Sequence, residues 1–323
     1  MTVDAGTGSG RLVIFNAEYD ALPRMGPNGL PAHACGHNLI TSASVAAFIA
    51  ASEILKAFKG EGRLRLLGTP AEESGGGKVR LIGRGAYDHV DACLMVHPGP
   101  KFEGNPKVKA VSVTTSLASQ RVSVAFQGKS SHAGFAPWEG KNALDALVTS
   151  YVNISTLRQQ LKPTTRVCGI ITEGGKAPNM IPDHTSAEFS IRAAHRDELR
   201  VLCDKMERCF DAGAAAADCD VESKPLVAFT DSWKAECADG ESYRHGPYLD
   251  TRANRTLCAL FTQHMNDFGS LVINELPAFS DNAGASTDQG KATSNTYILS
   301  IYNLTSYRKR ILCLSRNTAG LYY

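Results

Sequence analysis

The sequence predicts an α/β fold in which a mainly parallel sheet carries helices on its faces and is interrupted by a smaller α+β domain. Short apolar runs alternate with helical patterns in the first third of the chain, and the middle changes to alternating strands with two long helices. With 323 residues, 43% of them hydrophobic, the chain is long enough for two domains that each bury a core. Its balance of 34 basic and 32 acidic residues gives no support for binding nucleic acid.

The first domain is predicted from strands that alternate with helices. Its strands are short apolar runs, expected at residues 12–17, 63–68 and 92–97. The Ala-rich stretch Leu39–Phe58 predicts a long helix, and the Gly-rich turn Glu72–Gly77 leads into a second helix that reaches Gly85. The chain starts almost directly on its first strand, so we expect little before that strand to cover it.

The middle of the chain predicts an α+β domain at residues 117–229, with helices on one face of an antiparallel sheet. Its strands are expected at 121–127, 166–172 and 186–192, and its helices at 142–161 and 196–217. A helix over 252–268 then returns the chain to the first domain, whose two parts span 1–116, short at its N-terminal end, and 230–290. We interpret residues 291–323 as an atypical tail, truncated or mis-spliced, with no clear strand partner.

Cysteine usage and the N-terminal sequence favour a reduced, cytoplasmic compartment. The nine cysteines are odd in number and lack the paired spacing of a disulfide framework. The first ten residues contain no apolar stretch that resembles a signal peptide. No apolar run approaches the roughly 20 residues that a membrane helix needs, so we expect no membrane partner.

The densest chemical signal is the run His33-Ala-Cys-Gly-His-Asn38. Its Cys35 and His37 flank a glycine that lets the backbone bend tightly, so a thiolate and an imidazole can reach one metal ion or two adjacent ones. Taken alone, such a pair is more often a buried cysteine beside a surface histidine. A Cys35 nucleophile paired with a histidine is a weaker alternative, because it leaves the neighbouring carboxylates described next without a task.

Four further candidates lie at or just beyond the carboxyl ends of predicted strands, where α/β sheets gather active groups. Glu72 and Glu73 follow a strand, and one can bind metal while the other takes a proton from water; a solvated turn is the plainer alternative. His97 ends an apolar strand as a capping residue or a metal ligand. Asp20 can hydrogen-bond a ligand histidine and fix its tautomer, or serve as a turn residue.

The middle domain carries three more polar candidates. His132 lies in a polar loop after a strand, where it is either an exposed histidine or a donor to a developing oxyanion. Asn179 lies in a second loop. Arg192 ends a strand, and its guanidinium is placed either to clamp a carboxylate or to lie on the surface.

Several motifs occur in one order along the chain: Ala17–Pro23, His33–Leu39, Pro70–Glu73, Ser131–Ala133 and Asn179–Pro182. Together they resemble the M20 metallopeptidase family, and within it the amidohydrolases and dipeptidases, over the stretch from about Leu12 to Asp288. The resemblance implies a zinc-peptidase-like catalytic domain interrupted by a lid domain that also forms a homodimer. It implies hydrolysis of an amide bond in a dipeptide or N-acyl amino acid with two divalent metal ions, zinc on ligand softness or else manganese.

The resemblance assigns four metal ligands: Cys35, His37, Glu73 and His97. It makes Glu72 the general base and later the general acid, and gives Asp20 the task of orienting the site. From the lid, His132 would stabilise the oxyanion in the partner's site. Asn179 and Arg192 would hold the substrate.

Two departures from the family pattern bear on activity. The first motif reads Glu18-Tyr-Asp20 where the wider family often has His-x-Asp. The segment Ala285–Gly290 matches the family, yet no histidine follows His264 to supply a last metal ligand. Three hypotheses follow: an active metal-dependent hydrolase, a non-catalytic dimeric relative that binds a ligand, or an inactive fragment of such an enzyme.

Overall fold

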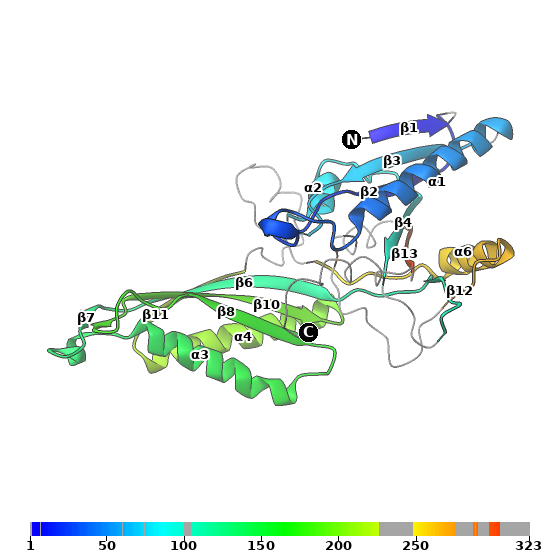
Figure 1. Cartoon of the computed structure of the whole chain (residues 1–323). Helices are drawn as coiled ribbons and strands as arrows, with labels where there is room; N and C mark the ends of the chain where they lie inside the picture. The colour runs from blue at the N-terminus through cyan, green and yellow to red at the C-terminus, as the bar shows by residue number, and fades with distance from the viewer. Residues whose placement is uncertain are drawn as a thin grey trace. The chain divides into compact units, whose positions relative to one another are not determined.

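The chain forms two compact units in a computed structural model that describes residues 2–6, 8–59, 61–73, 75–99, 105–225, 248–274, 287, 289 and 297–303 (Figure 1). Unit 1 is made of residues 1–115, 251–283 and 291–323. Unit 2 is made of residues 116–250 and 284–290. The domain boundary expected at 229–230 and most of the motif Ala285–Gly290 lie outside the described residues.

Unit 1 is built on a seven-stranded sheet in the order β1-β3-β2-β4-β13-β5-β12. Its centre is parallel, because β2 (Leu12–Glu18) pairs in parallel with both β3 (Arg63–Thr69) and β4 (Ala92–Pro98). The remaining strands are β1 (Thr2–Gly6), β5 (Ala110–Val111), β12 (Val272–Ile273) and β13 (Tyr297–Asn303). The predicted α/β fold with a mainly parallel sheet is confirmed.

Two strands of this sheet depart from the sequence prediction. The polar start of the chain forms β1, which pairs antiparallel with β3 and adds a sheet edge where little was expected to precede the first strand. An ion pair between Asp4 and Arg65, at 2.8 Å, joins the two strands across their exposed side. In the tail, β13 lies parallel to β4, so the expectation that the tail has no strand partner is wrong for these seven residues.

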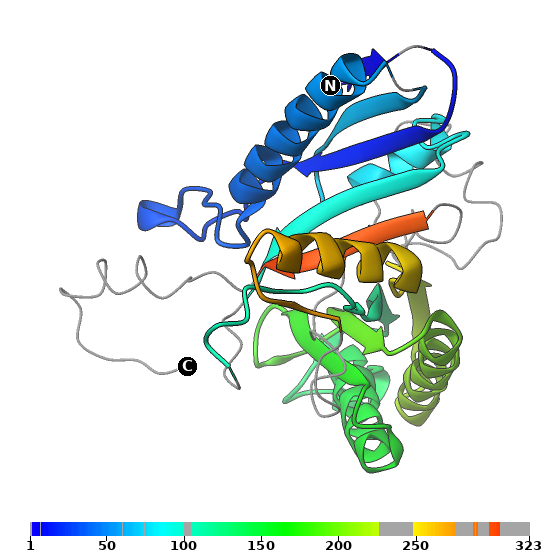
Figure 2. The same cartoon turned by 90° about the vertical axis from the view of Figure 1, so that its right-hand side faces the viewer.

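Helix α1 (His37–Ala57) covers the central strands of unit 1 (Figure 2). It packs edge-to-face through Phe48 on Phe15 of β2, at 6.3 Å between ring centroids. Two hydroxyls tie the helix to the end of that strand, since Thr41 donates to the carbonyl of Glu18 and Ser44 donates to that of Asn16. Among its described residues, the unit also has α2 (Gly77–Gly83), α6 (Arg255–Asp267) and the short 3-10 helix η1 (Pro27–Gly29).

By length and composition, α1 is long and apolar enough to cross a membrane, with a mean hydropathy of 1.5 over its most apolar window. This corrects the sequence expectation that no apolar run approaches that length. The buried residues Ile40 and Phe48 face the sheet, whereas Leu39 and Ile54 on the other side are more than half exposed. Its contacts with β2 are those of a helix that covers a sheet in a globular unit.

Unit 2 is an antiparallel four-stranded sheet in the order β11-β6-β10-β8 with two helices packed on one face (Figure 1). Its elements are β6 (Ala118–Gln127), η2 (Pro137–Glu139), α3 (Ala143–Leu157), η3 (Arg158–Gln160), β8 (Arg166–Glu173), β10 (His184–Ala193), α4 (Arg196–Ala216) and β11 (Asp220–Pro225). This is the α+β arrangement predicted for the middle of the chain.

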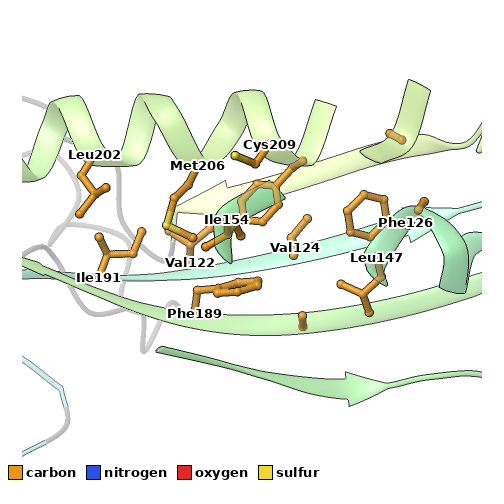
Figure 3. Packing of buried hydrophobic residues seen from close by; sticks show 14 of the residues in the cluster. Val122, Val124, Phe126, Leu147, Ile154, Phe189, Ile191, Leu202, Met206 and Cys209 are labelled. Atoms are coloured by element: carbon orange, nitrogen blue, oxygen red, sulfur yellow. The ribbon is translucent and has the colours of Figure 1, made fainter. Parts of the chain in front are cut away.

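The core of unit 2 lies between that sheet and its helices (Figure 3). Phe126, Phe189 and Phe210 fill it, the last two with ring centroids 5.5 Å apart. Gly213 of α4 lets the helices approach closely, because a Cβ there would lie 2.0 Å from the hydroxyl of Ser150 in α3. A small two-stranded ribbon, β7 (Ser131–His132) with β9 (Met180–Ile181), extends the unit.

Candidate functional site

Loops at the carboxyl ends of three parallel strands bring the sequence candidates of unit 1 together. Asp20 follows β2, Glu72 and Glu73 follow β3, and His97 lies near the end of β4. The fourth contribution comes from the start of α1, where Gly36 adopts a left-handed conformation with φ of 85°. The helix therefore begins at His37, two residues before the Leu39 start expected from sequence, and Cys35 and His37 lie beside the strand ends.

The donor atoms of these residues form two overlapping groups, within each of which they lie within 4.8 Å of one another. The first group is Cys35, His37 and His97, and the second is His37, Glu72 and Glu73. The Cys35 Sγ lies 3.4 Å from the Nε2 of His97. A tetrahedral zinc ion with a thiolate and an imidazole separates two such donors by about 3.5 Å, so this spacing suits a shared metal ion.

Asp20 connects His37 to the loop that carries Glu72 and Glu73. Its Oδ1 lies 3.0 Å from Nδ1 of His37, and its Oδ2 accepts a hydrogen bond of 2.9 Å from the backbone N–H of Glu73. One carboxylate therefore fixes the imidazole and the loop that carries the glutamate pair. Burial opposes ionisation of Asp20, but its hydrogen bonds with His37 and Glu73 outweigh that effect and lower the pKa of Asp20.

Both histidines of the cluster direct Nε2 into it, because their Nδ1 atoms are engaged elsewhere. The Nδ1 of His37 is engaged by Asp20, and the Nδ1 of His97 lies 2.6 Å from the carbonyl oxygen of Pro98, to which it donates. Each bond keeps a proton on Nδ1, so Nε2 is the nitrogen that binds a ligand, an arrangement that metal-binding histidines commonly have. The rings meet edge to face with centroids 5.9 Å apart.

Electrostatics differ sharply among the three donors Cys35, His37 and His97. Burial disfavours the charged form of His37, yet hydrogen bonds to Asp20 and Cys35 and the charge of Glu18 raise its pKa to about 11. Burial lowers the pKa of His97, and burial together with the charges of the glutamate pair raises the pKa of Cys35. Without a cation, His37 is therefore an imidazolium, His97 a neutral imidazole and Cys35 a thiol.

Unsatisfied buried atoms at the centre of the cluster fit a metal ion. Among the described residues, the Nε2 of His37, Oε1 of Glu73 and Oε2 of Glu18 are buried and make no hydrogen bond. Such atoms are costly unless a ligand satisfies them. The two oxygens lie 3.7 and 3.5 Å from that nitrogen, close to the separation of about 3.4 Å between donors around one tetrahedral zinc.

The turn that carries the glutamate pair is conformationally demanding. Ala71, just before Glu72, has a positive φ of 60°, a region that residues other than glycine rarely occupy. Gly77 lies against the same turn, and a Cβ there would fall 1.7 Å from the carbonyl oxygen of Pro70. The three glycines after the glutamate pair thus let the chain fold back under it, which accounts for the Gly-rich sequence.

Two further residues, Glu18 and Lys78, lie at the cluster without having been predicted there from sequence. Glu18, the last residue of β2, lies with its Oε2 3.5 Å from the Nε2 of His37. Lys78, at the start of α2, forms a buried ion pair with it at 2.5 Å. A glutamate that ends an apolar strand, and a lysine that directly follows a Gly-rich turn, are the signals that could have identified them.

His132 and Asn179 belong to unit 2 and lie on adjacent segments there. His132 is on β7, which pairs with β9, and the backbone carbonyl of Asn179 accepts from Ala133 N–H at 3.1 Å. Backbone N–H groups of Gly134 and Phe135 both donate to Nδ1 of His132, at 3.2 and 3.1 Å. Since Nδ1 is an acceptor, the neutral ring carries its proton on Nε2 and offers a fixed donor to solvent.

Arg192 is separated from these two residues along the sheet of unit 2. It lies at the far end of β10, whereas His184 begins that strand beside Gln127, the last residue of β6 before the loop to β7. The eight steps along the strand from His184 to Arg192, at about 3.3 Å each, place these two residues about 26 Å apart. A single small molecule therefore cannot touch Asn179 and Arg192 of the same chain.

Comparison with known proteins finds relatives for both units. Residues 116–218 match the family model of the M20 peptidase dimerisation domain. The chain is 40% identical over 283 residues to the Xaa-Arg dipeptidase of Mus musculus, covering 87% of this chain and 58% of the mouse protein. It is 31% identical over 236 residues to a component of the p-aminobenzoyl-glutamate hydrolase of Escherichia coli, covering 68% of this chain and 47% of that protein.

Solved structures share the fold at lower identity. A crystal structure of a protein from methicillin-resistant Staphylococcus aureus gives a TM-score of 0.68 at 18% identity, over 94% of this chain and 76% of that one. A Bacillus subtilis structure described as a dinuclear metal binding peptidase gives a TM-score of 0.65 at 18% identity, over 94% and 74%. Of the mouse and Escherichia coli relatives described above, the chain spans about half the length.

Proposed function

Because the chain belongs to the M20 peptidase family, we propose that it catalyses metal-dependent hydrolysis of an amide bond in a dipeptide or N-acyl amino acid. The observation that carries the proposal is the donor cluster of unit 1, in which Cys35, His37 and His97 meet the glutamate pair. The mouse relative's name, an Xaa-Arg dipeptidase, makes a dipeptide ending in a basic residue the first substrate to try.

Four residues would hold two divalent metal ions: Cys35, His37, Glu73 and His97. Zinc is the favoured ion, because a thiolate and two imidazoles are comparatively soft ligands. Bound there, a divalent ion acts as a Lewis acid that makes water a stronger acid and polarises a carbonyl. The Nδ1 hydrogen bonds of the two histidines keep their Nε2 atoms directed into the cluster.

Glu72 is proposed as the general base and acid. It is 7% exposed, and its Oε2 lies 3.7 Å from Nε2 of His37, so its carboxylate faces the cluster directly. In this role it accepts a proton from the attacking water and later returns that proton to the leaving amine. Asp20 would hold the loop through the Glu73 N–H, which keeps the neighbouring carboxylate in position.

His132 is proposed to stabilise the oxyanion with its Nε2–H, which the two backbone bonds to Nδ1 prepare for donation. We propose that Asn179 and Arg192 bind the substrate, and their separation along β10 favours contributions from two copies of the chain. A homodimer through unit 2 fits this, since β8 is an edge strand with Ile170 64% exposed.

Metal analysis and a hydrolysis panel test the proposal. The purified chain should retain zinc after dialysis and hydrolyse members of a panel of dipeptides and N-acyl amino acids, including dipeptides that end in arginine or lysine. Treatment with a chelator should abolish turnover, and zinc or manganese should restore it. Stoichiometric metal without hydrolysis of any panel member would favour the ligand-binding relative, and absence of both would refute the proposal.

A further inference from the structure

Glu18 and Lys78 form an ion pair that is enclosed within unit 1. Both side chains are 0% exposed, and the Nζ of Lys78 lies 2.5 Å from Oε1 of Glu18. Removing two charges from water is expensive, and apolar residues of similar volume are often as stabilising or more so. A buried ion pair that borders a cluster of metal-binding groups therefore points to a task other than stability.

Only one of the two oxygens of Glu18 is bound by Lys78. The other, Oε2, lies 3.5 Å from Nε2 of His37 and makes no hydrogen bond. A buried carboxylate oxygen that makes no hydrogen bond is costly, so its position favours a ligand. Oε1 of Glu73 lies 3.7 Å from the same nitrogen and also makes no hydrogen bond.

The side from which Glu18 approaches His37 distinguishes a ligand from a residue that merely orients the ring. Asp20 already orients the ring from Nδ1, at 3.0 Å. Glu18 meets the opposite nitrogen, Nε2, which is the one left to bind a metal ion once it has released its proton. A carboxylate on this side can bind the same metal ion as His37, whereas a carboxylate on the Nδ1 side fixes the tautomer of the ring.

We propose that Glu18 contributes Oε2 to the metal site as a further ligand, with Lys78 holding the carboxylate in place through Oε1. This inference rests on the proposed function, because it requires the metal that the function needs. Lys78 also offsets the charge of one carboxylate in a cluster that holds Asp20 and the glutamate pair as well. Charge-assisted hydrogen bonds of this kind fix a carboxylate more firmly than neutral ones do.

Metal binding by matched variants tests the proposal without relying on activity. The variants are Glu18→Gln and the double variant Glu18→Gln/Lys78→Met, which removes both charges and leaves neither unpaired. The control is the surface pair of α1, Glu53 and Lys56, which are 2.8 Å apart and 66% and 69% exposed; it is changed to Glu53→Gln/Lys56→Met. Each full chain is stripped of metal and titrated with zinc by calorimetry and with cobalt(II) by absorption spectroscopy.

We expect both Glu18 variants to lose at least about tenfold in zinc affinity and to change the cobalt(II) ligand-field bands, and the control to match the wild type. A double variant with wild-type affinity and spectrum would overturn the inference, and the proposed function would stand because the wild-type chain binds metal. A wild-type chain that binds neither ion would refute both. A chain that binds metal through Glu18 but hydrolyses no amide would support this inference and refute the proposed function alone.

Discussion

Metal binding should release two protons from Cys35 and His37 together. In the metal-free protein His37 has a pKa of about 11, and burial and the charges of the glutamate pair raise the pKa of Cys35. Both groups therefore carry a proton at neutral pH, and both must lose it to bind metal. His97, whose pKa is lowered by burial, is already neutral and adds none.

The same protonation states set the pH dependence of binding. Two competing protons reduce metal affinity by about a hundredfold for each unit by which the pH falls in the neutral range, one factor of ten for each group. The stability of the metal-free fold depends on pH in the opposite direction. Because the pKa of His37 is raised on folding, its contribution to the free energy of unfolding is fully present below the unfolded pKa of 6.5 and is lost as the pH rises through about 11.

Calorimetric titration with zinc in buffers of different ionisation enthalpy measures the released protons. The wild-type chain should release one proton more than Cys35→Ala, and His97→Ala should release as many as the wild type. The titrations are run at about pH 6, below the pKa of about 7 of zinc-bound water, so that the released protons come from the side chains. Equal release by the wild type and Cys35→Ala would refute the assignment of Cys35 as a protonated thiol that becomes a ligand.

Three further variants test other parts of the structure. Glu72→Ala should retain zinc in metal analysis yet lose at least about a hundredfold in kcat, because it removes the proton acceptor and not a ligand; turnover near the wild-type rate would exclude Glu72 as the base. Asp20→Asn should weaken zinc affinity by about tenfold to a hundredfold in calorimetry, since it replaces the carboxylate that orients His37, and unchanged affinity would contradict that role. Phe126→Ala removes a side chain that is 0% exposed in the core of unit 2 and should lower the free energy of unfolding by about 3–5 kcal/mol in denaturant titration, whereas a loss below about 1 kcal/mol would mean that the core is not packed as described.

Regular patterns in the sequence were sufficient to predict most of the secondary structure. The apolar run at 12–17 and the Ala-rich stretch after Asn38 became β2 and α1, because hydrophobic periodicity reports directly on burial. The strand β1 was missed since its residues are mostly small and exposed, so it has no burial pattern. The strand β13 pairs with β4, about 200 residues earlier in the chain, and local patterns carry no signal of such pairing.

The donor cluster was predicted from residue type and position at strand ends, and the structure brings those residues together. The role of each stays a prediction. Position along the chain could have marked Glu18 and Lys78 singly, but it could not predict that they pair, because they are 60 residues apart and a buried lysine is rare. The distance between Arg192 and Asn179 also depends on the length of β10 and on the ribbon beyond it, which become known only once the strands are paired.

The length of β10 determines how defects in two chains combine. If one end of unit 2 serves the chain's own site and the other end serves a second copy's, each site draws residues from both polypeptides. Two inactive variants, one lacking Glu72 and one lacking His132, would then complement each other when mixed. Random pairing forms the mixed dimer half of the time, with one intact site of two, so about a quarter of wild-type activity should return. A single strand of ten residues would thus make catalysis a property of the pair.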